Sequence, residues 1–118
     1  MYDNDNVIAT KSRNFAIRTI KLYQYLQQEK NEYTMSRQLL KCGTSIGANV
    51  KEALRGQSKA DFAAKMNIAL KEASETEYWL DILNATNYIS NKEYKSINDD
   101  LLEISKLLTS IVKTSFNS

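Results

Sequence analysis

The fold is decided by one stretch near the end of the chain, SNKEYKSINDDLLEISKLLTSI, residues 90–111. Its apolar side chains recur at alternating steps of three and four, the spacing that places them on one face of an α-helix. Ser90, with Glu93 three positions later, forms the pattern of a capping box, in which the serine oxygen accepts an early backbone N–H and the glutamate reaches back. The stretch therefore predicts an amphipathic helix over residues 91–116. The apolar series runs Tyr94, Ile97, Leu101, Ile104, Leu108 and Ile111.

A second long helix is predicted upstream, over residues 59–87. Its apolar residues follow the same steps of three and four, from Phe62 to Leu83. Ser58, with Asp61 three positions later, is expected to cap its start in the same way, with aspartate in place of glutamate.

The helix predicted over residues 35–55 presents an unusually small face. Gly43 and Gly47 both lie on its apolar stripe. Each interior glycine costs about 1 kcal/mol of helix stability relative to alanine. Two glycines one turn apart therefore indicate that a neighbouring backbone approaches closely here.

The complete pattern is that of an all-α protein. A weaker apolar stripe predicts the first helix over residues 7–29, and the breaks fall at 30–34, 56–57 and 88–90. Connections this short force consecutive helices to run antiparallel, and the chain has no proline to interrupt them. We expect one domain over residues 1–118, an up-down-up-down antiparallel four-helix bundle.

Composition removes most common enzyme chemistries. The 118 residues are 42% apolar and 25% charged, which is typical of one globular domain. The chain has no histidine and a single cysteine, so Ser-His and Cys-His catalysis, His-based zinc sites and an internal disulfide are excluded. Helical carboxylates without Glu-x-x-His pairs are weak evidence for a dinuclear metal site. We therefore expect no catalytic residues, no metal and no cofactor, and we expect Cys42 to be a small buried hydrophobe.

The chain contains no pattern that would place it in or across a membrane. Its longest apolar run is only a few residues, and its first residues lack the basic start and apolar core of a signal peptide. The sequence therefore predicts a cytoplasmic protein without a membrane partner.

Charge is distributed unevenly although the net charge is only +2. Residues 1–60 carry 10 Lys/Arg against 5 Asp/Glu, and residues 61–118 carry 6 against 9. Either the two halves neutralise each other within one antiparallel fold, or the first two helices present a basic face to a polyanion such as RNA or DNA. The residues that would form this basic face are Arg13, Arg18, Lys21, Lys51, Arg55 and Lys59.

The hairpin between the second and third helices allows cross-helix partners to be predicted. A turn centred on Gly56 and Gln57 brings Arg37, Gln38 and Lys41 opposite acidic residues of the next helix, where pairing would satisfy their charges. The expected neighbours are Glu52 with Asp61, Ser45 with Ile68, Lys41 with Glu72, and Gln38 with Glu75.

Ser45, Asn49 and Glu52 form a second polar line on one face of the 35–55 helix. Such a line either is a solvated face that fixes the helix register through hydrogen bonds, or contacts a ligand. Trp79 is either a packing or interface anchor or a platform on which a nucleic-acid base stacks, and we interpret it as an anchor.

These motifs resemble the bacterial four-helix bundle proteins called 23S rRNA-intervening sequence proteins, or S23 ribosomal proteins. The resemblance implies small cytoplasmic bundles that assemble as cyclic homo-oligomers, typically pentamers. It also implies a relation to accessory proteins of reverse transcriptases, which bind nucleic acid through basic surfaces. The segments that carry the resemblance are RQL (37–39), TSIGANVKEA (44–53), Ser58, DF (61–62), ALKEA (69–73) and ETEYWL (75–80).

Two function hypotheses follow. The first is a non-enzymatic homo-oligomeric scaffold that presents a surface to an unidentified protein partner, in which small residues let helices approach and polar pairs select one packing and one oligomer. The alternative is a nucleic-acid-binding accessory protein that uses the basic face, with ring symmetry multiplying a modest charge per subunit. The residues assigned to packing and assembly are Arg37, Gln38, Gly43, Ser45, Gly47, Asn49, Glu52, Ser58, Asp61, Glu72, Glu75 and Trp79.

Overall fold

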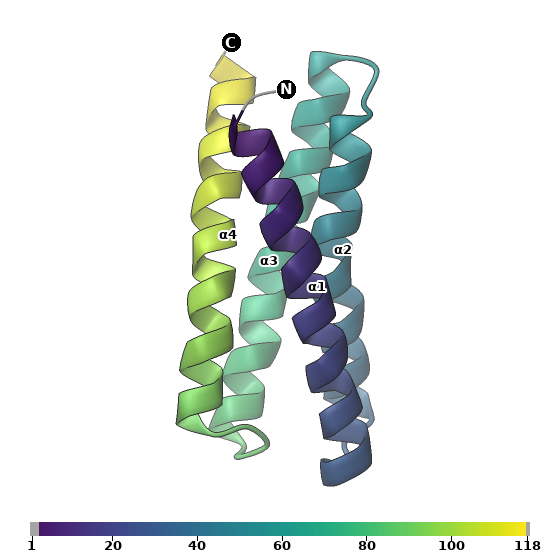
Figure 1. Cartoon of the computed structure of the whole chain (residues 1–118), viewed down its shortest axis with the longest axis vertical. Coiled ribbons are helices and arrows are strands. Elements are labelled where there is room, and N and C mark those ends of the chain that lie inside the picture. The colour runs from purple at the N-terminus through teal and green to yellow at the C-terminus, as the bar shows by residue number, and fades with distance from the viewer. Residues whose placement is uncertain (1–2, 118) are drawn as a thin grey trace.

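The protein is a bundle of four long helices. The computed structural model describes residues 3–117, with their side chains from residue 6 to residue 116. Successive helices run in opposite directions and neighbours in sequence pack side by side (Figure 1), which confirms the predicted four-helix bundle. The helices are α1 (Asp3–Lys30), α2 (Thr34–Leu54), α3 (Lys59–Ala85) and α4 (Asn91–Asn117).

The helix ends differ from the prediction where the apolar pattern carries no signal. The first helix, predicted from residue 7, begins at Asp3. The apolar stripe did not reveal this extra turn, because its first apolar position is Ile8 and the preceding residues are mostly polar. α3 ends two residues earlier than predicted. There Asn87 adopts a left-handed φ of 67°, and the N–H of Tyr88 donates to the carbonyl of Leu83 at 2.9 Å, which is a Schellman closure.

The predicted N-terminal caps form. The hydroxyl oxygen of Ser58 accepts from the backbone N–H of Asp61 at 3.0 Å, and that of Ser90 accepts from Glu93 at 3.1 Å. The Glu93 carboxylate accepts from the Ser90 hydroxyl itself, also at 3.1 Å. Both caps thus start their helices where the sequence predicted.

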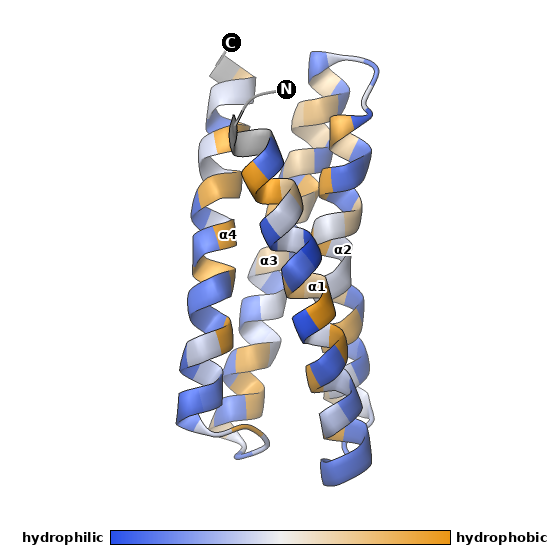
Figure 2. Ribbon diagram, viewed as in Figure 1, coloured by the Kyte–Doolittle hydropathy of each residue, from blue (hydrophilic) through white to orange (hydrophobic). Residues whose placement is uncertain are grey.

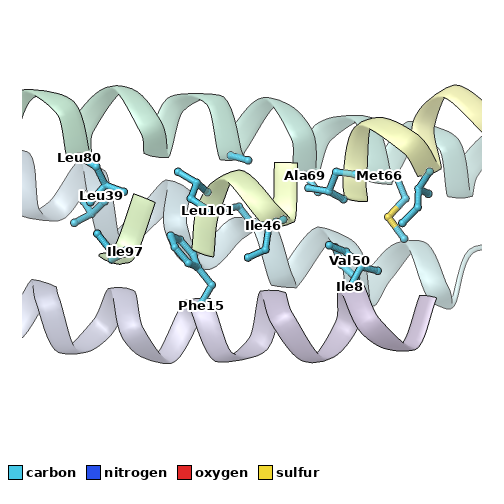
Figure 3. Close-up of a cluster of buried hydrophobic side chains, with 14 of the residues drawn as sticks. Ile8, Phe15, Leu39, Ile46, Val50, Met66, Ala69, Leu80, Ile97 and Leu101 are labelled. Carbon is cyan, nitrogen blue, oxygen red and sulfur yellow. The ribbon is translucent and has the colours of Figure 1, made fainter. Parts of the chain in front are cut away.

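The apolar stripes of the four helices face one another along the length of the bundle (Figures 2 and 3). Cys42 belongs to this core, as expected, and burial raises the pKa of its thiol to about 11 although a hydrogen bond with Thr76 opposes the shift. The largest fully buried apolar side chains are Ile8, Leu26, Leu39, Ile46, Val50, Met66, Leu80, Leu83, Leu101, Ile104 and Leu108.

α1 and α2 pack closely because α2 has glycine at the contact. A Cβ atom on Gly43 would lie 2.6 Å from the Cγ2 atom of Thr19, and one on Gly47 would lie 3.2 Å from the carbonyl oxygen of Ser12. Thr19 is fully buried, and its hydroxyl donates to the carbonyl of Phe15 at 2.9 Å. The close backbone approach predicted from the glycine pair is confirmed, and the partner helix is α1.

α1 contacts α4 less extensively than it contacts α2, and the two helices diverge along the bundle (Figure 1). Two ion pairs join them, Lys11 with Glu103, and Arg18 with Asp100 at 2.7 Å. α1 and α3 lie diagonally across the bundle and make no close backbone contact.

The connection before α2 contains a buried carboxylate that the sequence analysis did not identify. Glu32 is only 7% exposed, and its two oxygens accept from three backbone N–H groups in the first turn of α2. The Ser36 hydroxyl donates back to the carbonyl of Glu32 at 2.8 Å. The donors to the carboxylate are the N–H groups of Thr34 at 3.1 Å, Met35 at 2.9 Å and Ser36 at 2.7 Å.

We expect Gly43→Ala to destabilise the bundle by about 1–3 kcal/mol, because the new Cβ atom would collide with Thr19 and overpack the core. An isolated helix would gain about 1 kcal/mol from the same change. Urea unfolding of the wild type and of Gly43→Ala measures the change in the free energy of unfolding. In a Thr19→Ala background the colliding γ atoms are absent, so the penalty should shrink. A raised unfolding midpoint for Gly43→Ala in the wild-type background would refute the close contact.

Glu32→Ala should lower the free energy of unfolding by about 1–3 kcal/mol, because buried backbone donors at the start of α2 lose their acceptor. Glu29→Ala, in the last turn of α1 and exposed, is the matched control and should have little effect. Thermal and urea unfolding of both variants test this, and equal stabilities for the two would contradict the capping role.

Candidate interaction surfaces

The polar line of α2 lies beside α3, but most of its hydrogen bonds stay within α2. The Ser45 hydroxyl donates to the carbonyl of Lys41 at 2.7 Å, and the Asn49 amide donates to the carbonyl of Ser45 at 2.8 Å. Glu52 reaches across to α3, where its carboxylate lies 3.6 Å from the Nζ atom of Lys65. These side chains do little to hold the two helices together.

The side chain of Glu52 contacts α3 one helical turn beyond Asp61, the residue predicted to lie near it. Asp61 stays in the first turn of α3, beside Gly56 of the connection, and its N–H is bonded to Ser58. Lys65, one turn further along α3, is the residue that reaches Glu52.

Glu72 and Glu75 lie on α3, in the region where the sequence placed them. Burial raises the pKa of Glu72, the charge of Glu75 raises it further, and the charge of Lys41 opposes both, so Lys41 and Glu72 are near each other as expected. Glu75 lies near α2, because its charge contributes to the raised pKa of Cys42, and its predicted closeness to Gln38 stays a prediction. The Glu75 carboxylate accepts from the indole N–H of Trp79 at 3.2 Å.

Aromatic side chains stand beside these carboxylates on the surface. The rings of Tyr78 and Trp79 meet edge to face, with centroids 5.0 Å apart. Tyr78 is 56% exposed and Ile68, on the same helix, is 40% exposed. We call the following residues of α3 the acidic aromatic patch: Glu72, Glu75, Glu77, Tyr78, Trp79 and Asp81.

The acidic aromatic patch carries an unbalanced charge. Residues 72–85 contain four carboxylates and no lysine or arginine. Among the residues that the structure describes, the ion pairs involve other acids. Burial raises the pKa of Tyr94 on α4, and the charges of Asp81 and then Glu77 raise it further, which places both carboxylates near that ring.

The six predicted basic residues do not all share one face. Arg18 lies on the α4 side of α1, where its guanidinium pairs with Asp100 and donates to the Ser96 hydroxyl at 2.7 Å. Lys21 is exposed on α1, one residue before the half-buried Leu22, and Lys59 is the first residue of α3.

The other three basic residues, Arg13, Lys51 and Arg55, lie along the junction of α1 and α2. Arg13 directly follows Ser12, which contacts Gly47, and Lys51 lies one turn beyond that glycine. Arg55 follows Lys51 by a further turn, so helical spacing keeps the three on one side.

Arg37 lies about five helical turns before Arg55, so helical spacing puts it on the same side of α2 as Lys51 and Arg55. Its predicted position opposite the acidic residues of α3 stays a prediction. We call the following residues the basic apolar stripe: Arg13, Ile17 and Ile20 of α1, with Arg37, Leu40, Lys51 and Arg55 of α2.

A cavity of about 170 Å³ opens between α1 and α4, smaller than typical ligand pockets of roughly 300–1,000 Å³. Among the described residues, no three acidic or cysteine side chains gather as a metal site. Within the same residues, no helix is long and apolar enough to cross a membrane. The cavity is lined by Lys11, Asn14, Phe15, Asp100, Glu103 and Ile104.

Comparison with known proteins agrees with this architecture. The family model described as 23S rRNA-intervening sequence protein matches residues 4–110. A crystal structure of a protein with unknown function from the S23 ribosomal protein family, from Bacteroides thetaiotaomicron VPI-5482, is 56% identical to this chain. The match covers 93% of this chain and 98% of that one, with a TM-score of 0.92. No curated protein compared with the chain gives a significant match. The chain belongs to the 23S rRNA-intervening sequence protein family.

Proposed function

We propose that this protein is a non-enzymatic scaffold that assembles with copies of itself and presents a surface to a protein partner. One observation carries the proposal: motif side chains such as Asn49 and Trp79 bond within their own helices on the α2–α3 surface. Trp79 packs against the edge of the core, and Asn49 bonds only along α2, so contact with another molecule accounts better for the polar and aromatic groups that both residues leave at this surface. In this proposal the assembly is a cytoplasmic ring, with five copies as the family resemblance implies.

The surface chemistry supports contact over catalysis. Protein interfaces combine aromatic anchors with polar groups that fix orientation, and Tyr78 and Trp79 beside Glu75 provide both. Catalysis would need an activated group in a cavity, whereas Cys42 is buried with a pKa of about 11 and its thiol is uncharged at neutral pH. The carboxylates of α3 lie on a convex helix surface.

Replacing polar residues of the α2–α3 surface should change the assembly and leave the helices intact. We expect Asn49→Leu and Glu52→Leu to keep the far-ultraviolet circular dichroism of the wild type. Both variants should alter the mass measured by light scattering, because the polar pairs that select one packing are lost.

Ser110→Leu is the matched control, since Ser110 is exposed on α4, away from this surface. A wild-type protein that is monomeric at micromolar concentration would refute the scaffold proposal. An unchanged mass for both variants would refute the role of these two side chains.

Nucleic-acid binding is the second candidate function, and the basic apolar stripe favours it. Residues 6–28 and 33–51 contain no aspartate or glutamate, so no carboxylate lies within one helical turn of the exposed Arg13, and the carboxylate of Glu52, next to Lys51, is directed to Lys65 of α3. A ring would repeat this stripe on every subunit and multiply its attraction for phosphates.

Binding to a structured ribosomal RNA fragment and to duplex DNA, each at low and near-physiological salt, tests this function. Micromolar binding that survives the higher salt would make nucleic-acid binding the primary function. Arg13→Glu with Lys51→Glu should then flatten the salt dependence, because fewer phosphate contacts release fewer counterions. Binding that disappears at the higher salt would leave the scaffold alone.

A further inference from the structure

Segments of α1 and α2 carry only positive charge, and the second half of α3 carries only negative charge. Residues 6–28 and 33–51 together carry seven lysines and arginines and no acidic residue. Residues 72–85 carry four acidic residues and no basic one. Unlike charges that are separated in this way attract each other only weakly across water and salt, so the single chain gains little from them.

Only part of this charge is neutralised within the bundle. α4 supplies partners to Lys11 and Arg18 through Glu103 and Asp100. The ion pairs of the described residues leave out the four cations of the basic apolar stripe and the four carboxylates of the acidic aromatic patch. Because α1 lies diagonally opposite α3, the α1 part of the stripe cannot reach the patch within one chain.

Both surfaces also expose apolar side chains. Ile17 and Ile20 of the stripe are 38% and 40% exposed, and Leu40 beside them is half-buried. The patch exposes Tyr78, with the half-buried Trp79 next to it. Removing such apolar area from water stabilises a contact by about 25 cal/mol per Å² before the costs of association.

We infer that copies of this chain meet head to tail, with the basic apolar stripe of one copy packed against the acidic aromatic patch of the next. The inference rests on the proposed self-assembly and names the two surfaces that would meet. Since the two surfaces differ, each copy uses both, and a repeated contact of this kind closes into a ring when the rotation between copies allows it.

The molecule is large enough for two such contacts. A standard interface takes about 800 Å² from each partner. Two of them would take about 1,600 Å² of the 7165 Å² that one chain exposes. Arginine and aromatic residues are enriched in such interfaces, and the stripe supplies three arginines and the patch two aromatic residues.

Charge reversal tests the pairing directly. A stripe variant carries Arg13→Glu and Lys51→Glu, and a patch variant carries Glu75→Lys and Asp81→Lys. Each variant places like charges at the contact, so light scattering should show a mass that falls toward the 13.5 kDa of one chain. A single chain that carries all four substitutions has opposite charges at the contact again, and its mass should return to the wild-type value.

Lys106→Glu with Lys113→Glu, two exposed residues of α4 outside both surfaces, is the matched control and should leave the mass unchanged. Circular dichroism and thermal unfolding establish that every variant is folded. Equimolar mixing of the stripe and patch variants should also give a larger mass than either variant alone, because each then finds a complementary surface on the other.

The outcomes separate this inference from the proposed function. A monomeric wild type would refute self-assembly itself. An oligomeric wild type whose stripe and patch variants keep its mass would overturn the pairing and leave the scaffold proposal standing. Folded stripe and patch variants that dissociate, followed by a four-substitution chain that stays dissociated, would also overturn the direct pairing.

Discussion

The close packing of α1 against α2 is the constraint on which the rest of the bundle depends. Gly43 leaves space for Thr19, and Gly47 lies against the backbone of Ser12, so the two helices stay together along their length. α1 cannot follow α2 this closely and also stay close to α4, and it diverges from α4 along the bundle (Figure 1). Two ion pairs at the surface, Lys11 with Glu103 and Arg18 with Asp100, join α1 to α4 beside the apolar contacts of the core.

Much of the fold could be predicted from the sequence, because steps of three and four and the caps at Ser58 and Ser90 are local signals. The buried Glu32 was missed for a physical reason. A carboxylate in a connection is normally solvated, and only the folded chain turns it toward the start of α2. The predicted α2–α3 register agrees with the closeness of Lys41 and Glu72, but it did not show that the long side chain of Lys65 would reach Glu52.

The candidate surfaces were harder to predict than the fold, because a basic residue contributes to a surface only through the side of the helix on which it lies. Arg18 appeared to belong with Arg13, yet it turns toward α4 and pairs with Asp100. Arg37 was placed opposite the acidic residues of α3, and helical spacing puts it on the same side of α2 as Lys51 and Arg55. The rotation of a helix about its own axis decides which neighbour each basic side chain faces. For α2 this rotation is known from Gly43, which lies against Thr19 of α1.

The two candidate functions compete for the same side chains. If the basic apolar stripe is covered by the acidic aromatic patch of a neighbouring copy, the cations of that stripe already have partners and cannot also contact phosphates. Carboxylates of a neighbouring copy and phosphates of a nucleic acid satisfy lysine and arginine through the same charge-assisted hydrogen bonds. Ile17 and Ile20, exposed beside Arg13, distinguish a protein partner from a nucleic acid. Burying these apolar side chains against an aromatic protein surface is favourable, whereas contact with a phosphate backbone removes little of their area from water. The composition of the stripe thus favours a protein partner.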